Sequence, residues 1–347
     1  MRRVGRRPRG FRSAASRSFR HGSGLVENHK VLMRLRTISV LLLAATAWLA
    51  MLVLMPGCEG GSGPGTDKPL VVCTTGQVGD MVSRIGGEHI AVETLMGPGV
   101  DPHLYKATPR DRRLLNAAAA VFYNGLHLEG RMAELLESLS RHKPVFAVTE
   151  VLKAECPEKL RRPEGTEGVY DPHVWFDVAL WARCAGYAGQ KLGQVDPTHA
   201  ADYQRRAAEY QAELAALDAE VRQQIGSIPK ARRVLVTAHD AFHYFSRAYD
   251  IEVYSLQGIS TVDEADLGTV NRLVELLVGR QIKAVFVESS VPARNIQALI
   301  QGCHARGHTV RIGGELYSDA LGPAGTPEAS YVGVVRHNVR CIVEALR

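Results

Sequence analysis

The chain has 347 residues, of which 46% are hydrophobic and 22% are charged, a composition typical of a globular protein long enough to form two cores. The formal net charge of +6 would suit nucleic acid, but 11 of the 42 Lys and Arg residues lie in the first 36 positions, beside a single acid, Glu27. The rest of the chain holds 31 basic and 35 acidic residues. The basic charge therefore belongs to the N-terminal segment. The composition of the rest of the chain does not indicate nucleic-acid binding.

An apolar run follows the basic segment and predicts an export signal. Val40 to Met55 are sixteen uncharged, mostly apolar residues, fewer than the roughly 20 that a membrane-spanning helix needs. A basic flank, a short apolar core and a small residue at its end are typical of a secretory signal. An uncleaved anchor helix is the alternative, and Met33, just before the run, offers an alternative start of the chain.

The apolar run ends in "MPGC", whose last residue is Cys58 and which resembles a bacterial lipobox. In a lipobox the cysteine is lipidated and becomes the N-terminus of the mature protein. We therefore expect residues 1–58 to hold the basic segment, the signal sequence and the lipobox, with Cys58 as the lipidation site. Residues 59–69, rich in Gly and Ser, are then a flexible tether between the membrane and an extracytoplasmic domain.

Beyond the tether, short β-branched segments alternate with amphipathic ones. Strands are predicted at 70–75, 90–95, 119–124, 144–149, 233–238, 251–256, 283–288 and 308–313. Helices are predicted at 77–85, 110–118, 240–249, 264–280 and 293–306. This alternation predicts parallel sheets with helices on both faces, and the continuous apolar strands fit sheets that are buried on both sides.

One uninterrupted helix is predicted between the two sets of four strands. Asp196 is a natural N-cap and Pro197 a natural first residue, and no Gly or Pro interrupts Thr198 to Ile225. At 1.5 Å per residue this helix is roughly 40 Å long, enough to pass along a whole domain. We therefore predict an α/β fold of two lobes, each with a four-stranded, mostly parallel sheet flanked by helices, joined by one long backbone helix. The expected boundaries are 70–195 for the N-terminal lobe, 196–229 for the linking helix and 230–347 for the C-terminal lobe.

The six cysteines are too few to staple a chain of this size, and no C-x-x-C pair is present, which argues against a sulfur-based zinc site. In an exported chain two disulfides could still form, one between Cys303 and Cys341 and one between Cys156 and Cys184. Cys73 lies in an apolar run and is expected to be a buried thiol.

Two loops present a histidine in the same way. Asp-Pro-His precedes a predicted helix in "GPGVDPHLYKATPRD" and again in "YDPHVWFD", and the two histidines are His103 and His173. In the second half, His239 ends a strand in "VLVTAHDAFHYF", and Asp319 follows the last strand in "GGELYSDALG". Open α/β sheets collect ligands at the carboxyl ends of their strands. Three imidazoles and one carboxylate, two from each half, predict a site for a divalent ion of the first transition row.

Seven segments occur in a familiar order along the chain: "GPGVDPHLYKATPRD", "NGLHLEG", "DPHVWFD", "TAHDAFHYF", "GISTVDEADL", "VFVESSV" and "ELYSDALG". Together they resemble the zinc/manganese solute-binding proteins of ABC importers, the TroA-like cluster, and the resemblance covers Leu70 to Arg347. It implies metal ligands at His103, His173, His239 and Asp319. It also implies an extracytoplasmic receptor that binds one Zn²⁺ or Mn²⁺ between its lobes and delivers it to a membrane permease.

The resemblance leaves the ion open between zinc and manganese. Many zinc-dedicated members carry a long His-rich loop between the first two ligands, whereas this interval holds only His127 and His142. Three nitrogen ligands favour zinc by the Irving–Williams order. We expect a monomer held to the membrane by its N-terminal lipid, with a small movement of loops and lobes on metal binding because the linking helix is stiff.

Polar residues at the strand ends have supporting roles in this interpretation. Asp240 and Glu288 are expected to hydrogen-bond an imidazole ligand from behind. For Glu288, capping of the following segment is an equal alternative. His243 is expected on a helix surface, one turn after His239.

Three further residues near the ligands are assigned no part in binding the ion. His127 occupies a position of the resembling family that we interpret as structural. Tyr105 and Trp175 are expected to pack rather than to recognise a ligand.

Two other functions fit the same residues. A metal-binding surface adhesin is one, since surface lipoproteins of this type can contact other cells. A lipid-anchored, metal-dependent hydrolase is the other, but catalytic zinc keeps an open position for water, and four protein ligands leave little room for it. The sequence also has no H-E-x-x-H, G-x-S-x-G or P-loop motif, so we expect that the protein is not an enzyme.

Overall fold

The computed structural model describes residues 68–163, 168–262 and 266–347. The predicted export signal, Cys58 and the tether up to residue 67 lie outside these ranges. Residues Asp67–Arg347 form one compact unit. None of the helices within the described ranges is long and apolar enough to cross a membrane.

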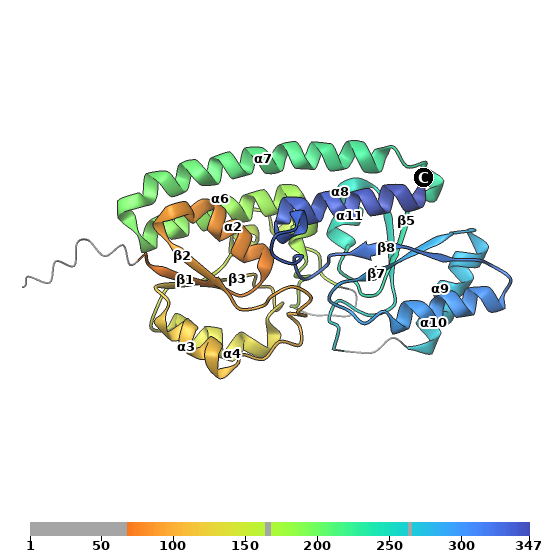
Figure 1. The fold of residues 1–347 in the computed structure, drawn as a ribbon, viewed down its shortest axis with the longest axis horizontal. Helices are drawn as coiled ribbons and strands as arrows, with labels where there is room; N and C mark the ends of the chain where they lie inside the picture. The colour runs from red at the N-terminus through yellow and green to blue at the C-terminus, as the bar shows by residue number, and fades with distance from the viewer. Residues whose placement is uncertain (1–67, 164–167, 263–265) are drawn as a thin grey trace, which may run out of the picture. The chain divides into compact units, whose positions relative to one another are not determined.

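The four strands of the N-terminal half form one parallel sheet, as predicted (Figure 1). Their order is β2-β1-β3-β4, and their bounds are β1 (Leu70–Cys73), β2 (Ala91–Thr94), β3 (Ala120–Tyr123) and β4 (Val145–Ala147). Val71 of β1 lies opposite Val92 on one side and Ala120 on the other. The helices of this half are α2 (Gly76–Gly86), α3 (Pro109–Ala117), α4 (Ala133–Ser140), α5 (Glu150–Glu155) and α6 (Val178–Val195).

Alternate residues of β1 face different layers of helices, because successive side chains of a strand point to opposite faces. Val71 and Cys73 pack with residues of α2 and α6, whereas Val72 packs with residues of α3 and α4. Figure 1 shows these two pairs of helices on opposite sides of the sheet. Cys73 is fully buried, as predicted, and burial raises the pKa of its thiol.

The C-terminal half holds the other four predicted strands as two parallel pairs, β5 with β6 and β7 with β8. Their bounds are β5 (Val234–Thr237), β6 (Glu252–Ser255), β7 (Ala284–Glu288) and β8 (Arg311–Leu316). The expected single four-stranded sheet is therefore corrected to two two-stranded sheets. The strands β5 and β7 are neighbours, but beyond the end of β5 the side chain of Glu288, and not a backbone carbonyl, accepts the N–H groups of Ala238 and His239.

Four helices complete the C-terminal half: α8 (His243–Tyr249), α9 (Leu267–Gly279), α10 (Arg294–Ala305) and α11 (Tyr331–Leu346). The first three were predicted, although α8 begins three residues later than expected. Short 3-10 turns lie at η1 (Gly87–His89), η2 (Gly130–Met132), η3 (Pro157–Lys159), η4 (Val174–Phe176), η5 (Pro197–His199), η6 (Lys230–Arg232) and η7 (Pro327–Ala329). The five cysteines of the described ranges are free thiols, so neither of the two possible disulfides is formed.

The long helix α7 (Ala200–Gly226) runs past both halves (Figure 1). Its buried face is Tyr203, Ala207, Tyr210, Leu214, Leu217, Val221 and Ile225. These residues belong to one core that also contains Val71 of the first sheet and Leu235 of β5, so the helix joins the two halves by packing. The predicted lobe boundaries at residues 195 and 230 stay a prediction, because both halves lie in the same compact unit.

The start of α7 differs from the prediction. The residues Pro197–His199 form a 3-10 turn, and the α-helix begins only at Ala200. Asp196 is not the N-cap of α7, since one of its carboxylate oxygens, Oδ2, accepts the Tyr203 hydroxyl at 2.7 Å and pairs with the His199 ring at 2.6 Å. The carboxylate is therefore used to fix the junction between α6 and α7.

Candidate metal centre

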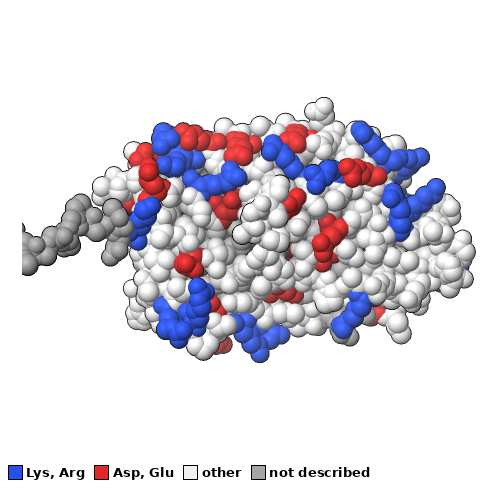
Figure 2. Space-filling view, viewed as in Figure 1, with Lys and Arg blue, Asp and Glu red and all other residues white. Residues whose placement is uncertain are grey.

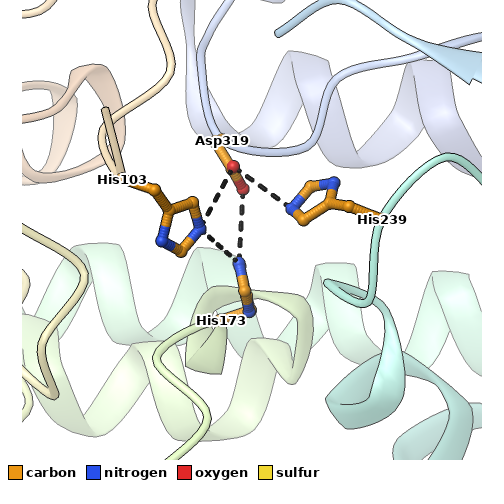
Figure 3. A group of neighbouring side chains, drawn as sticks. All are labelled: His103, His173, His239 and Asp319. Atoms are coloured by element: carbon orange, nitrogen blue, oxygen red, sulfur yellow. Dashed lines mark hydrogen bonds and ion pairs between the residues drawn. The ribbon is translucent and has the colours of Figure 1, made fainter. Parts of the chain in front are cut away.

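Four side chains singled out in the sequence meet at one point (Figure 3). His103 comes from the loop after β2, His173 from the loop before η4, His239 from the end of β5 and Asp319 from the loop after β8. One potential ligand atom from each lies within 4.8 Å of the other three. His173 and His239 are fully buried, whereas Asp319 is 2% and His103 is 6% exposed, so His103 is the ligand candidate nearest to solvent.

The repeated Asp-Pro-His sequence folds twice in the same way. Oδ1 of Asp101 accepts the backbone N–H of His103 at 2.8 Å, and Oδ1 of Asp171 accepts that of His173 at 3.0 Å. Aspartate side chains commonly bond the backbone two residues on, and the proline between them fixes φ. Each loop is thus held before any ion binds, and the two Nε2 atoms approach to 3.3 Å.

Asp171 also sets the orientation of the His173 ring. Its Oδ1 lies 2.8 Å from Nδ1 of His173, and because a carboxylate only accepts, Nδ1 carries the proton and Nε2 keeps a free lone pair. Arg161 pairs with the other carboxylate oxygen at 3.1 Å. Burial on its own raises the pKa of Asp171, but the hydrogen bond from His173 and the charge of Arg161 help to lower that pKa overall. Asp171 was not among the predicted site residues, although the repetition of Asp before Pro-His marks it in the sequence.

Glu288 supports His239 through both carboxylate oxygens. Oε1 accepts the backbone N–H groups of Ala238 at 2.7 Å and His239 at 2.9 Å, and Oε2 lies 2.6 Å from Nδ1 of the ring. Glu288 thus contacts an imidazole ligand, as expected, whereas the backbone N–H groups that its side chain accepts belong to the end of β5 and not to the segment that follows Glu288, so the capping alternative is corrected. Burial lowers the pKa of His239, but the charges of Glu288 and Asp319 outweigh it and raise that pKa well above its ordinary value.

The carboxylate of Asp319 lies among the three imidazoles. Its Oδ2 is 3.2 Å from Nε2 of His239 and 3.6 Å from Nε2 of His103, and its Oδ1 is 3.5 Å from Nε2 of His173. Burial raises the pKa of Asp319, but the imidazoles, His239 foremost, lower it well below its usual range. Within the described residues neither oxygen has a hydrogen-bond partner. The charge of Asp319 is therefore paired with His239, and a cation bound among the four side chains would take over that pairing.

The separations between these atoms fit a small coordination site. With Oδ2 as the ligand atom of Asp319, three of the six pairs of ligand atoms lie 3.2–3.6 Å apart, and the other oxygen, Oδ1, lies 3.5 Å from Nε2 of His173. In a tetrahedral zinc site with ligands at about 2.0–2.2 Å from the ion, neighbouring ligand atoms are about 3.3–3.6 Å apart. Three imidazole nitrogens and one carboxylate also suit divalent first-row ions by ligand type.

His103 differs from the other two imidazoles in its surroundings. Burial lowers the pKa of His103 to about 3, against the partial compensation of the Asp319 charge. Its ring is therefore neutral at physiological pH and offers a lone pair without first losing a proton. His103 also lines a cavity of about 270 Å³ together with His127, Ser260 and Val262.

Asp240 does not have the role that the sequence suggested. Its Oδ1 lies 2.5 Å from Nε2 of His243, and its Oδ2 lies 3.5 Å from Arg161, so its carboxylate pairs with these two side chains and not with an imidazole of the site. The expectation for Asp240 is therefore corrected. His243 itself is the first residue of α8 and is partly exposed, as expected.

The remaining candidates lie around the site. His127 is exposed and follows Leu126, and both have positive φ, 66° and 54°. The hydroxyl of Tyr105 donates to Asp111 at 2.7 Å, which fixes the loop between His103 and α3. Trp175 is buried, as expected, but it also donates its indole N–H to the carbonyl oxygen of Ser318 at 3.1 Å.

Comparison with known protein families finds a match over most of the chain. The family model described as "ZnuA: Zinc-uptake complex component A periplasmic" matches residues 71–345. The chain is 45% identical over 295 residues to the manganese-binding lipoprotein MntA of Bacillus subtilis, which covers 84% of this chain and 95% of that protein. It is 47% identical over 279 residues to the zinc-binding protein TroA of Treponema pallidum, covering 80% and 89%.

Solved structures share the fold. The structure of the periplasmic zinc-binding protein TroA from Treponema pallidum superposes with a TM-score of 0.77 at 46% sequence identity. The match covers 80% of this chain and 99% of that one. The Fe(III)-bound YtgA of Chlamydia trachomatis superposes with a TM-score of 0.73 at 26% identity, over 80% of this chain and 98% of that one. The predicted α/β fold class with a long linking helix is thus confirmed.

Proposed function

The chain belongs to the family of periplasmic zinc-uptake components represented by ZnuA, and from this membership we propose that it is a receptor for one divalent metal ion, Zn²⁺ or Mn²⁺. The receptor hands this ion, as its cargo, to the membrane permease of an ABC importer. His103, His173, His239 and Asp319 bind the ion, and Glu288 and Asp171 orient two of the imidazoles from behind.

One observation carries this proposal more than any other. A buried carboxylate, Asp319, lies within 3.6 Å of three imidazole Nε2 atoms, and within the described residues its oxygens accept no hydrogen bond. Buried charges in proteins are paired or coordinate metals. His103 and His173 present lone pairs at Nε2, and His239 does so once its Nε2 proton is released, so a divalent cation is the partner that satisfies all four groups together.

The geometry also bears on how the ion is held and released. Two of the proposed ligands come from each half of the chain, so a bound ion links the halves directly. Because α7 packs in one core with both halves, we expect only a small relative movement when the ion leaves. His103, which is the most exposed of the four and lines a cavity, marks the side from which the ion enters.

Members of this family are substrate-binding transport proteins rather than enzymes, and we propose the same for this chain. A catalytic metal keeps an open coordination position for water or substrate, with a general base beside it. Four buried protein ligands around one ion leave no such position in a tetrahedral site.

The choice of ion is a separate part of the proposal. The two relatives with 45% and 47% identity are named for manganese and for zinc, respectively. For a site with three nitrogen ligands, intrinsic affinity follows the Irving–Williams order and is higher for Zn²⁺. We therefore propose that the isolated protein binds Zn²⁺ more tightly and that manganese becomes the cargo only where supply favours it.

The cellular setting is also proposed from the relatives and the sequence. MntA of Bacillus subtilis and several more distant relatives are named lipoproteins. We propose an extracytoplasmic monomer, anchored to the membrane through a lipid on Cys58, that meets its permease at the membrane surface.

Metal analysis tests the proposed function. Protein stripped with a chelator and then dialysed against Zn²⁺ or Mn²⁺ is expected to retain one equivalent of ion per folded chain, and competition between the two ions is expected to favour Zn²⁺. Folded, stripped protein that takes up neither ion would refute the receptor proposal.

A further inference from the structure

The loop that carries Asp319 is held at the residue before it. Within the described residues the Asp319 oxygens have no polar partner besides the three imidazoles of the site, so the backbone of this loop sets where the carboxylate lies. The carbonyl oxygen of Ser318 accepts the indole N–H of Trp175 at 3.1 Å and the side-chain amide of Gln77 at 3.3 Å. Both donors come from the N-terminal half, although Asp319 follows β8 in the C-terminal half.

The following segment is attached to the same half. Leu321 packs against the first turn of α2 so closely that a Cβ at Gly76 would lie 3.0 Å from its Cγ. Further along, the hydroxyl of Tyr331 donates to the carbonyl oxygen of Trp175 at 2.6 Å. The backbone N–H of Tyr331 donates to Asp80 of α2 at 3.1 Å. The segment between β8 and α11 is therefore fastened to α2 and η4.

Contacts with the C-terminal half hold the loop from the other side. The hydroxyl of Ser318 lies 2.9 Å from the hydroxyl of Ser290, which follows β7. The side chain of Asn338, on α11, bonds the backbone N–H and carbonyl of Tyr317 at 2.9 and 2.7 Å. Both halves of the chain thus bond Ser318. Its carbonyl oxygen accepts hydrogen bonds from the N-terminal half, and its hydroxyl contacts Ser290 of the C-terminal half.

Trp175 connects this peptide to the metal centre. It lies two residues after His173 in the turn η4, its side chain is buried, and its ring centroid is 5.2 Å from that of His173. One short turn therefore supplies a proposed metal ligand and also the donor that fixes the loop of another.

We propose that Trp175 and Gln77 are positioning residues, which hold the Ser318 carbonyl and thereby keep Asp319 against the three imidazoles; this inference rests on the proposed function. While both donors are engaged, the carboxylate stays in the site and the ion is enclosed. When both hydrogen bonds break, the loop moves Asp319 out of the site, and the ion is left with three ligands. The two hydrogen bonds to Ser318 therefore set how long the ion stays bound.

Substitutions that remove these donors test the inference. Trp175→Phe removes the indole N–H, and Gln77→Met removes the amide at nearly constant length. Trp181→Phe is the matched control, because Trp181 is also fully buried but its indole N–H has no hydrogen-bond partner within the described residues. Release of Zn²⁺ into excess chromophoric chelator is followed by stopped flow, and the visible spectrum of the Co²⁺-loaded protein reports the ligand set.

Removing groups that orient metal ligands typically weakens binding about 10–100-fold. We therefore expect Zn²⁺ to leave Trp175→Phe at least about tenfold faster than wild type, with a smaller acceleration in Gln77→Met. The Co²⁺ spectrum of Trp175→Phe should move toward that of Asp319→Ala, and Trp181→Phe should match wild type in both measurements.

The outcomes separate this inference from the proposed function. If wild type and Trp181→Phe bind no Zn²⁺, the proposed function is wrong. If they bind Zn²⁺ while Trp175→Phe and Gln77→Met keep the wild-type release rate and Co²⁺ spectrum, only the positioning inference is overturned. If Trp175→Phe does not fold, Gln77→Met alone decides, and an unchanged release rate in that variant overturns the inference. If Trp181→Phe accelerates release as much as Trp175→Phe, loss of packing explains both and the inference also fails.

Discussion

Replacing Glu288 by glutamine should weaken metal binding while leaving the fold intact. In Glu288→Gln the amide oxygen can still accept the N–H groups of Ala238 and His239, which lie 2.7 and 2.9 Å from Oε1. The amide NH₂ then replaces Oε2, which lies 2.6 Å from Nδ1 of His239. An NH₂ group only donates, so Nδ1 must accept and the ring proton must move to Nε2, the atom that faces Asp319.

The loss of Zn²⁺ affinity can be estimated from this replacement of a carboxylate oxygen by an NH₂ group beside Nδ1 of His239. Binding an ion at Nε2 requires the proton to return to Nδ1, where it now meets another donor instead of a carboxylate. The lost interaction is a hydrogen bond to a charged group, about 1.5–3 kcal/mol. Since about 1.4 kcal/mol is a factor of ten in affinity, Zn²⁺ should bind about 10–100-fold more weakly.

Competition with a chelator of known affinity measures this change, and Asp240→Asn is its control. Asp240 directly follows His239 in the chain, but its carboxylate contacts His243 and Arg161 instead of His239. Asp240→Asn should therefore bind Zn²⁺ within about twofold of wild type. Wild-type affinity in Glu288→Gln, or an equal loss in both variants, would refute the reasoning about the His239 ring.

Three further predictions concern stability and processing. Burial raises the pKa of Asp111, but hydrogen bonds from Tyr105 and Thr108 lower it overall, so its stabilising effect is present above the unfolded pKa of about 3.9 and is lost as pH falls through the lower folded pKa. Asp111→Asn should accordingly melt at a lower temperature than wild type at pH 7, and the gap should close below about pH 3.9 in melts followed by circular dichroism; a constant gap would contradict this. Leu214→Ala, in the fully buried face of α7, should lower the free energy of unfolding in urea by about 2–5 kcal/mol, and a loss below about 1 kcal/mol would show that the helix is loosely packed. Cys58→Ser should keep its signal segment or be released from the membrane, and membrane-bound protein with a normal processed mass would refute the lipobox interpretation.

The metal-centre residues were predictable because local sequence signals mark them. Asp-Pro-His is a short-range motif whose aspartate and proline act within three residues, and both copies fold as the sequence suggests. His239 follows β5 and Asp319 follows β8, and although these strands belong to different two-stranded sheets, β5 lies next to β7, so the carboxyl ends of the strands still meet. These signals need no knowledge of the tertiary fold, so the four side chains could be selected before their distances were known.

The supporting residues could not be selected in the same way, because their roles depend on contacts across the fold. Asp240 and Glu288 both lie at strand ends, but only Glu288 is directed at His239. Trp175 reads as an ordinary core residue, and its partner Ser318 is 143 positions away in the sequence. No periodicity or local motif predicts a hydrogen bond at that separation.

Two features of the predicted fold were wrong: the start of the long helix and the continuity of the second sheet. The α-helical start at Asp196 failed because Tyr203 and His199 take its carboxylate, a choice that helix-capping preferences do not contain. The second sheet was expected to be continuous, but sequence patterns give the strands and not their pairing. In the first case nearby side chains override a helix-capping preference, and in the second the pairing of the strands depends on tertiary contacts.

Thermal melting with and without Zn²⁺ tests the central claim, that His103, His173, His239 and Asp319 hold the ion, most directly. Because metal binds only the folded chain, a thousandfold excess over Kd should stabilise wild type by about 4 kcal/mol. Alanine variants of the four should lose most of this metal-induced gain, whereas His127→Ala, changed at an exposed position in the neighbouring cavity, should keep it. A full metal-induced shift in any of the four variants, or its loss in His127→Ala, would contradict the assignment of the ligands.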